Sequence, residues 1–237
     1  MTKTESKHHK FLRILDSVKF HALVMAIGFI MVYPLIWLFA SSLKSNDTMF
    51  LNTYSLIPIK FDAAVNYLGA WKGVAGVSLL TFLGNSAFVT IVGTIGCVFT
   101  SILAAYAFTR VHFRFSRFWF SCVLVTMMIP TQVMVVPQYI ILKKMNLIDT
   151  RIALILPWFF GGGFFIFLLV QSLKAIPREL DEAAQIDGCG HFRILFNILV
   201  PILKPSIVTA SIFSFYWIWQ DFFQPLIFMS TTSKFTL

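Results

Sequence analysis

Residues 177–188 read PRELDEAAQIDG, a short polar stretch between two long hydrophobic segments. It holds four of the ten acidic residues of the 237-residue chain, Glu179, Asp181, Glu182 and Asp187. A charged side chain at the centre of a bilayer costs about 2.5–3.5 kcal/mol on insertion scales, so these carboxylates mark a segment outside the bilayer. A membrane protein that concentrates its acidic residues in one such segment offers them to another protein. The stretch therefore predicts a docking element.

Hydrophobic residues make up 58% of the chain and charged residues 12%, whereas soluble domains carry about 25% charge. A membrane-spanning helix needs about 20 apolar residues, and uncharged runs of this length recur along the chain. The sequence therefore predicts an all-α, polytopic membrane protein, with a basic tail at 1–19 and a transmembrane domain at 20–237. The expected spans are residues 20–43, 82–109, 118–142, 152–173 and 205–230, and residues 174–204 form a loop that contains the acidic stretch.

The distribution of basic residues predicts an orientation. Twelve Lys and Arg residues fall on the side of the N-terminal tail and the acidic loop, against seven on the opposite side. Because loops rich in Lys and Arg stay in the cytoplasm, the N-terminus and residues 174–204 are predicted to lie on the cytoplasmic side of a cell membrane. The net charge of +9 is explained by these loops facing anionic lipids, so no nucleic-acid partner is expected. The Cys and His residues show no metal-ligand spacing, and no metal or cofactor bound by this chain is expected.

The acidic loop is predicted to form two short helices joined by a turn. Pro177 suits the first position of a helix, the carboxylates that follow favour its N-terminal end, and Gly188 favours the left-handed conformation that ends it. An amphipathic helix lying on the membrane is the alternative, but such helices usually carry Lys and Arg on their polar face. The carboxylates here favour a protein partner. The residues at helical spacing that share one predicted docking face are Leu180, Ala183, Ala184 and Asp187.

The pattern EAA at 182–184, glycine at 188 and I-x-x-P at 198–201 resembles the EAA loop of permease subunits of ATP-binding-cassette (ABC) importers. The resemblance extends in order along nearly the whole chain and is closest to the carbohydrate branch, in particular to the smaller permease of maltose-type transporters. The further motifs that carry it are YPLIW at 33–37, SLK at 42–44, NS at 85–86, AAYA at 104–107 with Arg110, MIPTQ at 128–132, WQDF at 219–222 and PL at 225–226.

The resemblance implies a type I ABC importer transmembrane fold in which the acidic loop carries the coupling helix. That helix inserts into a cleft of a cytoplasmic ATPase subunit. Glu182 would meet basic or polar groups of the ATPase, the two alanines after it would allow close packing, and the glycine would set the turn. The residues assigned to ATPase coupling are Glu182, Ala183, Ala184, Asp187 and Gly188.

The resemblance also implies partners. These are ATPase subunits that bind Mg-ATP, a second homologous permease, an extracytoplasmic solute-binding protein, and a sugar or oligosaccharide as substrate. Family members usually carry a sixth span after the Lys-x-Thr-Leu pattern that lies here at 234–237. The resemblance therefore implies that five spans are present and that a sixth is missing at the C-terminus, which puts the assembly of the chain in question.

The chain is expected not to be an enzyme, and ATP hydrolysis is expected of a partner subunit. The run Gly161-Gly162-Gly163 is followed by Phe164, so it lacks the Lys that a phosphate-binding G-x-x-x-x-G-K-[ST] loop requires. These glycines are instead expected to allow close helix packing.

Polar residues inside hydrophobic segments mark a candidate substrate path. Asp221 interrupts a hydrophobic run next to an aromatic and an amide side chain, a combination that suits a sugar, whose ring faces stack while its hydroxyls hydrogen-bond. Gln132 follows Pro130, where freed backbone groups can line a cavity. A location of Asp221 at the outer interface, where Trp is enriched, is the alternative. The predicted substrate-path residues are Trp219, Gln220, Asp221, Gln132 and Asn85.

Two other classes of function remain open on the residues alone. A channel or secondary-transporter subunit would usually carry intramembrane ionisable relays or paired broken helices, for which a single Asp gives little support. A membrane-bound enzyme would need a catalytic group at the bilayer face, yet His21, His112 and His191 are scattered without partners. The permease of a sugar importer is therefore the main prediction.

Overall fold

The computed structural model describes residues 3–51 and 53–237, and side chains from residue 14 onward within those ranges. Every regular element in this described part is a helix. The chain divides into two compact units, residues 1–73 and 74–237, which are described separately. The all-α prediction is confirmed.

The first unit contains α1 (Lys3–Ser42), α2 (Asn46–Met49) and α3 (Ala63–Lys72). Helix α1 runs as one helix of 40 residues through both the predicted basic tail and the predicted first span. Its stretch Ile14–Ser42 is apolar and long enough to cross a membrane. The amide of Asn66 on α3 donates to the carbonyls of Ser42 and Lys44 at 2.9 and 2.7 Å, so the turn after α1 is fastened to α3.

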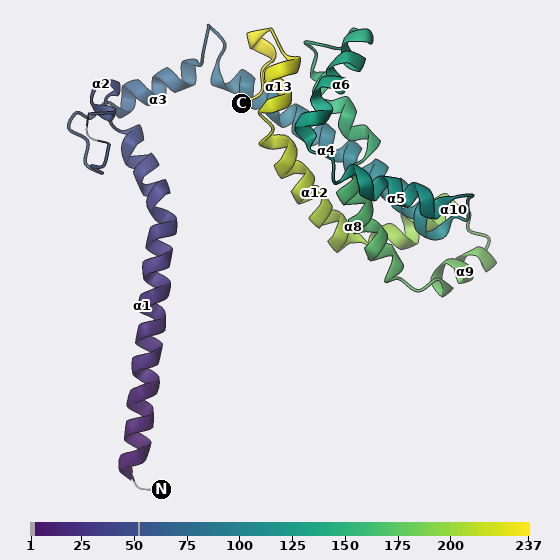
Figure 1. The fold of residues 1–237 in the computed structure, drawn as a ribbon, viewed down its shortest axis with the longest axis horizontal. Coiled ribbons are helices and arrows are strands. Elements are labelled where there is room, and N and C mark those ends of the chain that lie inside the picture. Colours follow the sequence, from purple (N-terminus) through teal and green to yellow (C-terminus); the bar gives the residue numbers. More distant parts are fainter. Residues whose placement is uncertain (1–2, 52) are drawn as a thin grey trace. The chain divides into compact units, whose positions relative to one another are not determined.

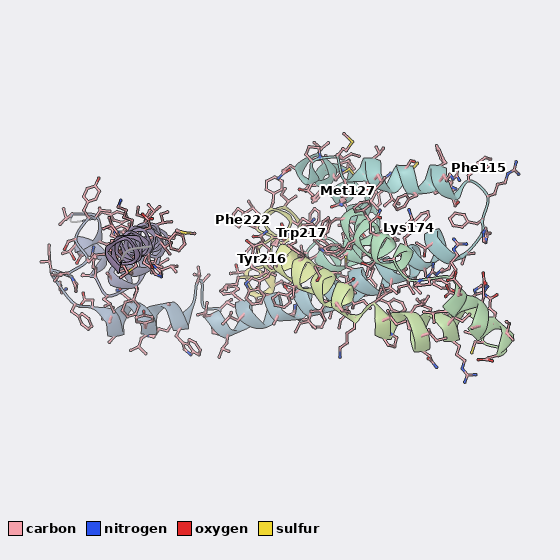
Figure 2. The ribbon with its side chains drawn as sticks, turned by 90° about the horizontal axis from the view of Figure 1, so that it is seen from below. Phe115, Met127, Lys174, Tyr216, Trp217 and Phe222 are labelled. Carbon is pink, nitrogen blue, oxygen red and sulfur yellow. The ribbon has the colours of Figure 1, made fainter. Side chains whose placement is uncertain are left out.

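The second unit is built around α4 (Leu79–Arg110), a helix of 32 residues that packs along α8 (Gly163–Lys174) and α12 (Lys204–Trp219) (Figure 1). Fully buried side chains from these helices, such as Cys97 and Phe165, form its core. Figure 2 labels Trp217 near the end of α12. The centroid of its ring lies 5.1 Å from that of Phe165. The apolar side chains of α4 are thus buried by the protein itself on one side.

The segment predicted as one span at 118–142 is broken in the structure. It consists of α5 (Ser116–Thr126) and α6 (Thr131–Lys144), whose axes differ by 105°. Pro130, which lacks a backbone N–H and cannot continue an α-helical hydrogen-bond ladder, lies at the break. The hydrophobic run predicted as one span therefore forms two helices at a sharp angle, because the length of such a run does not report the direction of its backbone.

The next stretch contains α7 (Arg151–Ile155), the 3₁₀ helix η1 (Leu156–Phe160) and α8. A Cβ atom on Gly163 would lie 2.9 Å from the carbonyl oxygen of Val123 and 2.8 Å from Cγ of Met127. The absence of a side chain at Gly163 therefore allows α8 to approach α5 closely. This is the packing role that the sequence predicts for the glycine run.

The C-terminal part of the unit contains a second sharp bend. The helical stretch His191–Ile202 meets α12 at an angle of 81°. It continues through Pro201 and contains a π-helical turn, in which the backbone bonds run from i to i+5. Its elements are α10 (His191–Arg193), the π helix η2 (Ile194–Leu199) and α11 (Val200–Ile202); α9 (Glu179–Ile186) precedes it, and α13 (Phe223–Phe228) and η3 (Thr232–Lys234) follow α12.

The predicted span at 205–230 is also interrupted, since α12 ends at Trp219 and α13 is a separate short helix. Three stretches in the described residues are long and apolar enough to cross a membrane singly, namely Ile14–Ser42, Leu79–Arg110 and Arg151–Lys174. The predicted count of five is reached only if each of the two bent pairs is one span.

Candidate coupling and substrate sites

The acidic stretch folds as the sequence predicts, into a short helix followed by a glycine turn. Helix α9 covers Glu179–Ile186, and Gly188 has a φ of +79°, which is the left-handed conformation that glycine adopts without strain. The backbone N–H of Gly188 donates to the carbonyl of Gln185, and that of Cys189 to the carbonyl of Ala184, both at 2.9 Å. The last carbonyls of α9 are thereby satisfied within the turn.

The structure buries one of the four residues of the predicted docking face of α9. Ala184, expected on the docking face with Leu180, Ala183 and Asp187, is only 6% exposed and packs against the core, whereas the other three are exposed. Asp181 is the second buried residue of the helix. The exposed residues opposite these two, at helical spacing, form what we call the docking face of α9: Glu179, Glu182, Ala183 and Ile186.

Ile186 is the residue of this face that the sequence did not single out. Its side chain is 87% exposed on a helix whose opposite side is buried. The docking face therefore combines two carboxylates, a small residue and an unpartnered branched apolar side chain.

The inward side of α9 is fixed by an ion pair that was not predicted. Nε of Arg110, at the end of α4, lies 2.7 Å from Oδ2 of Asp181, and the two side chains are 6% and 9% exposed. Nη2 of Arg110 also donates to the carbonyl of Ile176 at 2.8 Å. Arg178 does not pair with Glu182, which lies four residues further along the chain. Its Nη2 instead donates to the carbonyl of Thr109 at 2.8 Å. No sequence signal marked Arg110 and Asp181 as partners, since 71 positions separate their numbers.

Three of the five predicted substrate-path residues meet in one pocket of about 400 Å³. Gln132 comes from the start of α6, whereas Gln220 and Asp221 lie directly after α12. Trp158 and Trp217 line the same pocket and give it aromatic walls. The bend between α5 and α6 and the end of α12 thus bring together polar groups that are distant in the sequence.

Asp221 also shapes the backbone at this pocket. Its Oδ1 accepts hydrogen bonds from the backbone N–H groups of Phe223 and Gln224 at 3.1 and 3.3 Å. These bonds satisfy free donors at the start of α13, the usual role of an acidic residue at a helix N-terminus. Gln224, which the sequence did not single out, lines this pocket and also a larger, mostly apolar hollow of about 790 Å³.

The other two predicted substrate-path residues lie elsewhere. Trp219 stacks on Phe215, with ring centroids 5.7 Å apart and planes at 10°, and lines a separate small hollow with Asp221. Asn85 is 3% exposed, and its amide nitrogen donates to the carbonyls of Ser233 and Phe235 at 2.9 and 2.8 Å. These contacts give Asn85 a structural role, and the structure adds no support for placing it in a substrate path.

A carboxylate clamp holds the segment that follows α13. Oδ1 of Asp149 accepts the backbone N–H groups of Ser230 and Thr231, each at 3.0 Å. Its Oδ2 accepts Lys234 Nζ at 2.8 Å and Thr231 Oγ1 at 2.6 Å. The bond from Lys234, followed by that from Thr231, holds the pKa of the Asp149 carboxyl well below its usual value.

Known proteins resemble the chain in sequence and in fold. The family described as "Binding-protein-dependent transport system inner membrane component" matches residues 96–234. The chain belongs to this family. The permease resemblance found in the motifs is thereby confirmed, and the chain is a multi-helix component of the inner membrane.

Curated relatives match most of the chain. The chain is 35% identical over 198 residues, 83% of its length, to "Probable ABC transporter permease protein YurM" of Bacillus subtilis, and 36% identical over 86% of its length to "sn-glycerol-3-phosphate transport system permease protein UgpE" of Agrobacterium fabrum. It is 30% identical over 89% of its length to "Arabinooligosaccharides transport system permease protein AraQ" of Halalkalibacterium halodurans. The matches cover 64% of YurM and 74% and 75% of the other two. Across three leading relatives the chain spans 56% to 64% of their length.

A solved structure shares the fold. A chain of a bacterial ABC transporter involved in the import of the acidic polysaccharide alginate superposes with a TM-score of 0.77 and 21% identity, over 99% of this chain and 78% of that one. The predicted ABC importer fold class is confirmed.

Proposed function

We propose that the chain is the permease subunit of an ATP-driven, binding-protein-dependent sugar importer, that it forms half of the translocation pathway and that it docks a cytoplasmic ATPase through α9. The docking face carries this proposal. A helix whose inner side is fixed by a buried ion pair presents Glu182 and a fully exposed Ile186 outward. An exposed apolar side chain between carboxylates on a rigid helix is suited to a protein partner.

The chemistry of the docking face defines the partner surface. Glu179 and Glu182 would meet Lys or Arg side chains of the ATPase, Ala183 would allow its backbone to approach, and Ile186 would fill an apolar pocket. Opposite charges of this kind set orientation and association rate, while the apolar anchor supplies affinity. The orientation inferred from the basic loops places this face in the cytoplasm.

The remaining partners follow from the family. Its description names dependence on a binding protein, which supports an extracytoplasmic solute-binding protein, and a second permease would complete the pathway. Mg-ATP would be bound by the ATPase subunits. ATP shifts the permease between inward-open and outward-open states only if it binds the ATPase more tightly in one of them.

The pocket near α13 supports an uncharged sugar as substrate. Trp158 and Trp217 offer aromatic faces, and Gln132, Gln220 and Asp221 offer hydrogen-bonding groups. Among the described residues that line it there is no Lys, Arg or His. The amide and aromatic lining therefore suits the uncharged rings and hydroxyls of a sugar.

Affinity purification of the tagged protein, expressed from its own gene in its native membranes, tests the proposal. We expect an ATPase and a second permease to co-purify, and Glu182→Lys to weaken recovery of the ATPase. Asn197→Lys, which also introduces a lysine but at an exposed position outside α9, is the control and should retain it. If no ATPase co-purifies with the unchanged protein from well-solubilised membranes, the proposal fails and a channel or secondary-transporter subunit takes its place.

A further inference from the structure

The last turns of α4 hold the polypeptide on both sides of α9. Before α9, Arg110 binds the carbonyl of Ile176 and Arg178 binds the carbonyl of Thr109, each at 2.8 Å. After α9, the hydroxyl of Tyr106 lies 3.0 Å from Nδ1 of His191. The ion pair from Arg110 to Asp181 fastens the helix itself. Helix α9 is therefore attached to α4 at its start, in its middle and beyond its end.

The covalent connections of α9 to its neighbouring helices are not helical. Residues 175–178 and 187–190 lie outside any helix. The second connection contains two glycines and the first a proline, so neither continues a rigid helical axis from α8 or into α10. A displacement of α9 along its docking surface would be absorbed in these connections unless another contact carried it. The buried ion pair is one such contact, because removal of either charge would leave the other buried without its counter-charge.

The opposite end of α4 holds the segment after α13. Besides Asn85, the hydroxyl of Ser86 accepts the backbone N–H of Leu237 at 2.6 Å. Helix α4 is continuous between the two sets of contacts and is about 48 Å long at 1.5 Å per residue. Figure 1 shows α9 and α13 at opposite ends of α4.

We propose that Arg110 and Asp181 are positioning residues, which form the joint that passes a displacement of α9 to α4, and that α4 carries it to residues 230–237 at its other end. The inference rests on the proposed function, since the displacement is the one that an ATPase would impose. It assigns coupling to two side chains that do not contact the ATPase. A static contact network is not evidence of coupling by itself, so the joint must be tested by breaking and restoring it.

The test measures a nucleotide response at the far end of α4. Ser233→Cys places a thiol on an exposed residue whose carbonyl is held by Asn85, in a background with Cys122 and Cys189 replaced by Ser. The native complex is reconstituted in vesicles, and labelling of this thiol by a membrane-impermeant maleimide is timed with and without Mg-ATP plus vanadate. We expect the nucleotide to change the labelling rate severalfold.

Arg110→Gln and Asp181→Asn should each reduce this nucleotide effect at least about threefold while the ATPase still co-purifies, because the docking face is unchanged. Arg110→Asp combined with Asp181→Arg should restore the effect, which a merely structural loss would not do. If a single variant does not accumulate, Arg110→Lys replaces it. It keeps the cation but replaces the planar guanidinium that pairs with Asp181 by a single ammonium group, and it should show a smaller response than the unchanged protein.

Two results would overturn the joint. One is a full nucleotide effect in the single variants or in Arg110→Lys. The other is a reversed pair that binds the ATPase but responds no better than the single variants. The inference would also be rejected if the complex with native Arg110 and Asp181 contained the ATPase but showed no nucleotide effect at position 233. The proposed function would then still stand. Absence of any ATPase from the unchanged complex would reject the proposed function itself.

Discussion

Asp149 and Lys234 form an ion pair of 2.8 Å between Nζ and Oδ2 that joins the loop before α7 to the segment after α13. The same Lys234 ammonium also donates to the backbone carbonyl of Asp149 at 2.7 Å. Because the carboxylate accepts backbone and hydroxyl groups as well, it orders the whole segment at the end of α4 opposite α9. Residues 230–237, at the end of α4 opposite α9, therefore depend on the ionised carboxylate of Asp149.

This clamp should be sensitive to acid. The pKa of Asp149 is held below its usual value, chiefly by Lys234, so its ionised form stabilises the folded state above the unfolded pKa, about 3.9. That contribution is lost as the pH falls below about 4 toward the folded pKa. Protease cleavage within residues 230–237 should therefore increase as the pH is lowered through this range.

Asp149→Asn should raise cleavage at neutral pH and remove most of its pH dependence, whereas Asp16→Asn, at an exposed position of α1, should behave as the unchanged protein. An equally steep acid response in Asp149→Asn would show that another group controls the segment.

Helix α9 shows which part of a site can be predicted from sequence. Its existence and its end follow from local signals, the proline before it and Gly188 after it. The side of the helix that is buried does not follow from local signals, because the burial of Asp181 depends on Arg110 at the end of another helix. The sequence therefore assigned Ala184 to the outward face although it is buried, whereas the other three residues of the predicted face are exposed.

The exposure of Ile186 leads to a prediction about docking. Ile186→Asp places a charge in the apolar centre of the docking face and should weaken ATPase binding at least about tenfold, or about 1.4 kcal/mol. Asp187→Asn, at the edge of the face, should change it less than about threefold. Both affinities can be measured by titrating the purified permease with the ATPase once it is identified. Equal losses in the two variants would favour the face that the sequence predicted.

The polar residues in or beside hydrophobic segments show a second limit of sequence analysis. Gln132 and Asn85 were selected by the same criterion, a polar amide in or beside a hydrophobic run. The structure places Gln132 in the pocket with Asp221, whereas the amide nitrogen of Asn85 is used by two carbonyls. Hydrogen-bond partners nearly 150 positions away decide between the two roles. The breaks at 127–130 and 220–222 were likewise missed because hydropathy reports burial in lipid and not backbone direction.

Asn85→Ala should therefore act on stability. It leaves the carbonyls of Ser233 and Phe235 without their donor, and an unsatisfied buried polar group costs about 1–3 kcal/mol. We expect a lower melting temperature in detergent and an unchanged preference among transported sugars. A variant with full stability and an altered sugar preference would return Asn85 to the substrate path.

Gln220→Leu should show the opposite behaviour. The residue is exposed after the end of α12 and lines the pocket with Asp221 and Gln132. Its replacement therefore removes hydrogen bonds to sugar hydroxyls without leaving a protein group unsatisfied. Loss of one such bond costs about 0.5–1.5 kcal/mol, which corresponds to a two- to tenfold increase in the substrate concentration for half-maximal uptake. Uptake of radiolabelled neutral oligosaccharides by cells that carry each variant measures it. Ser230→Ala, at an exposed position beyond α13 outside this pocket, is the control. An unchanged concentration dependence in Gln220→Leu, with a normal amount of protein in the membrane, would place the substrate path elsewhere on the chain.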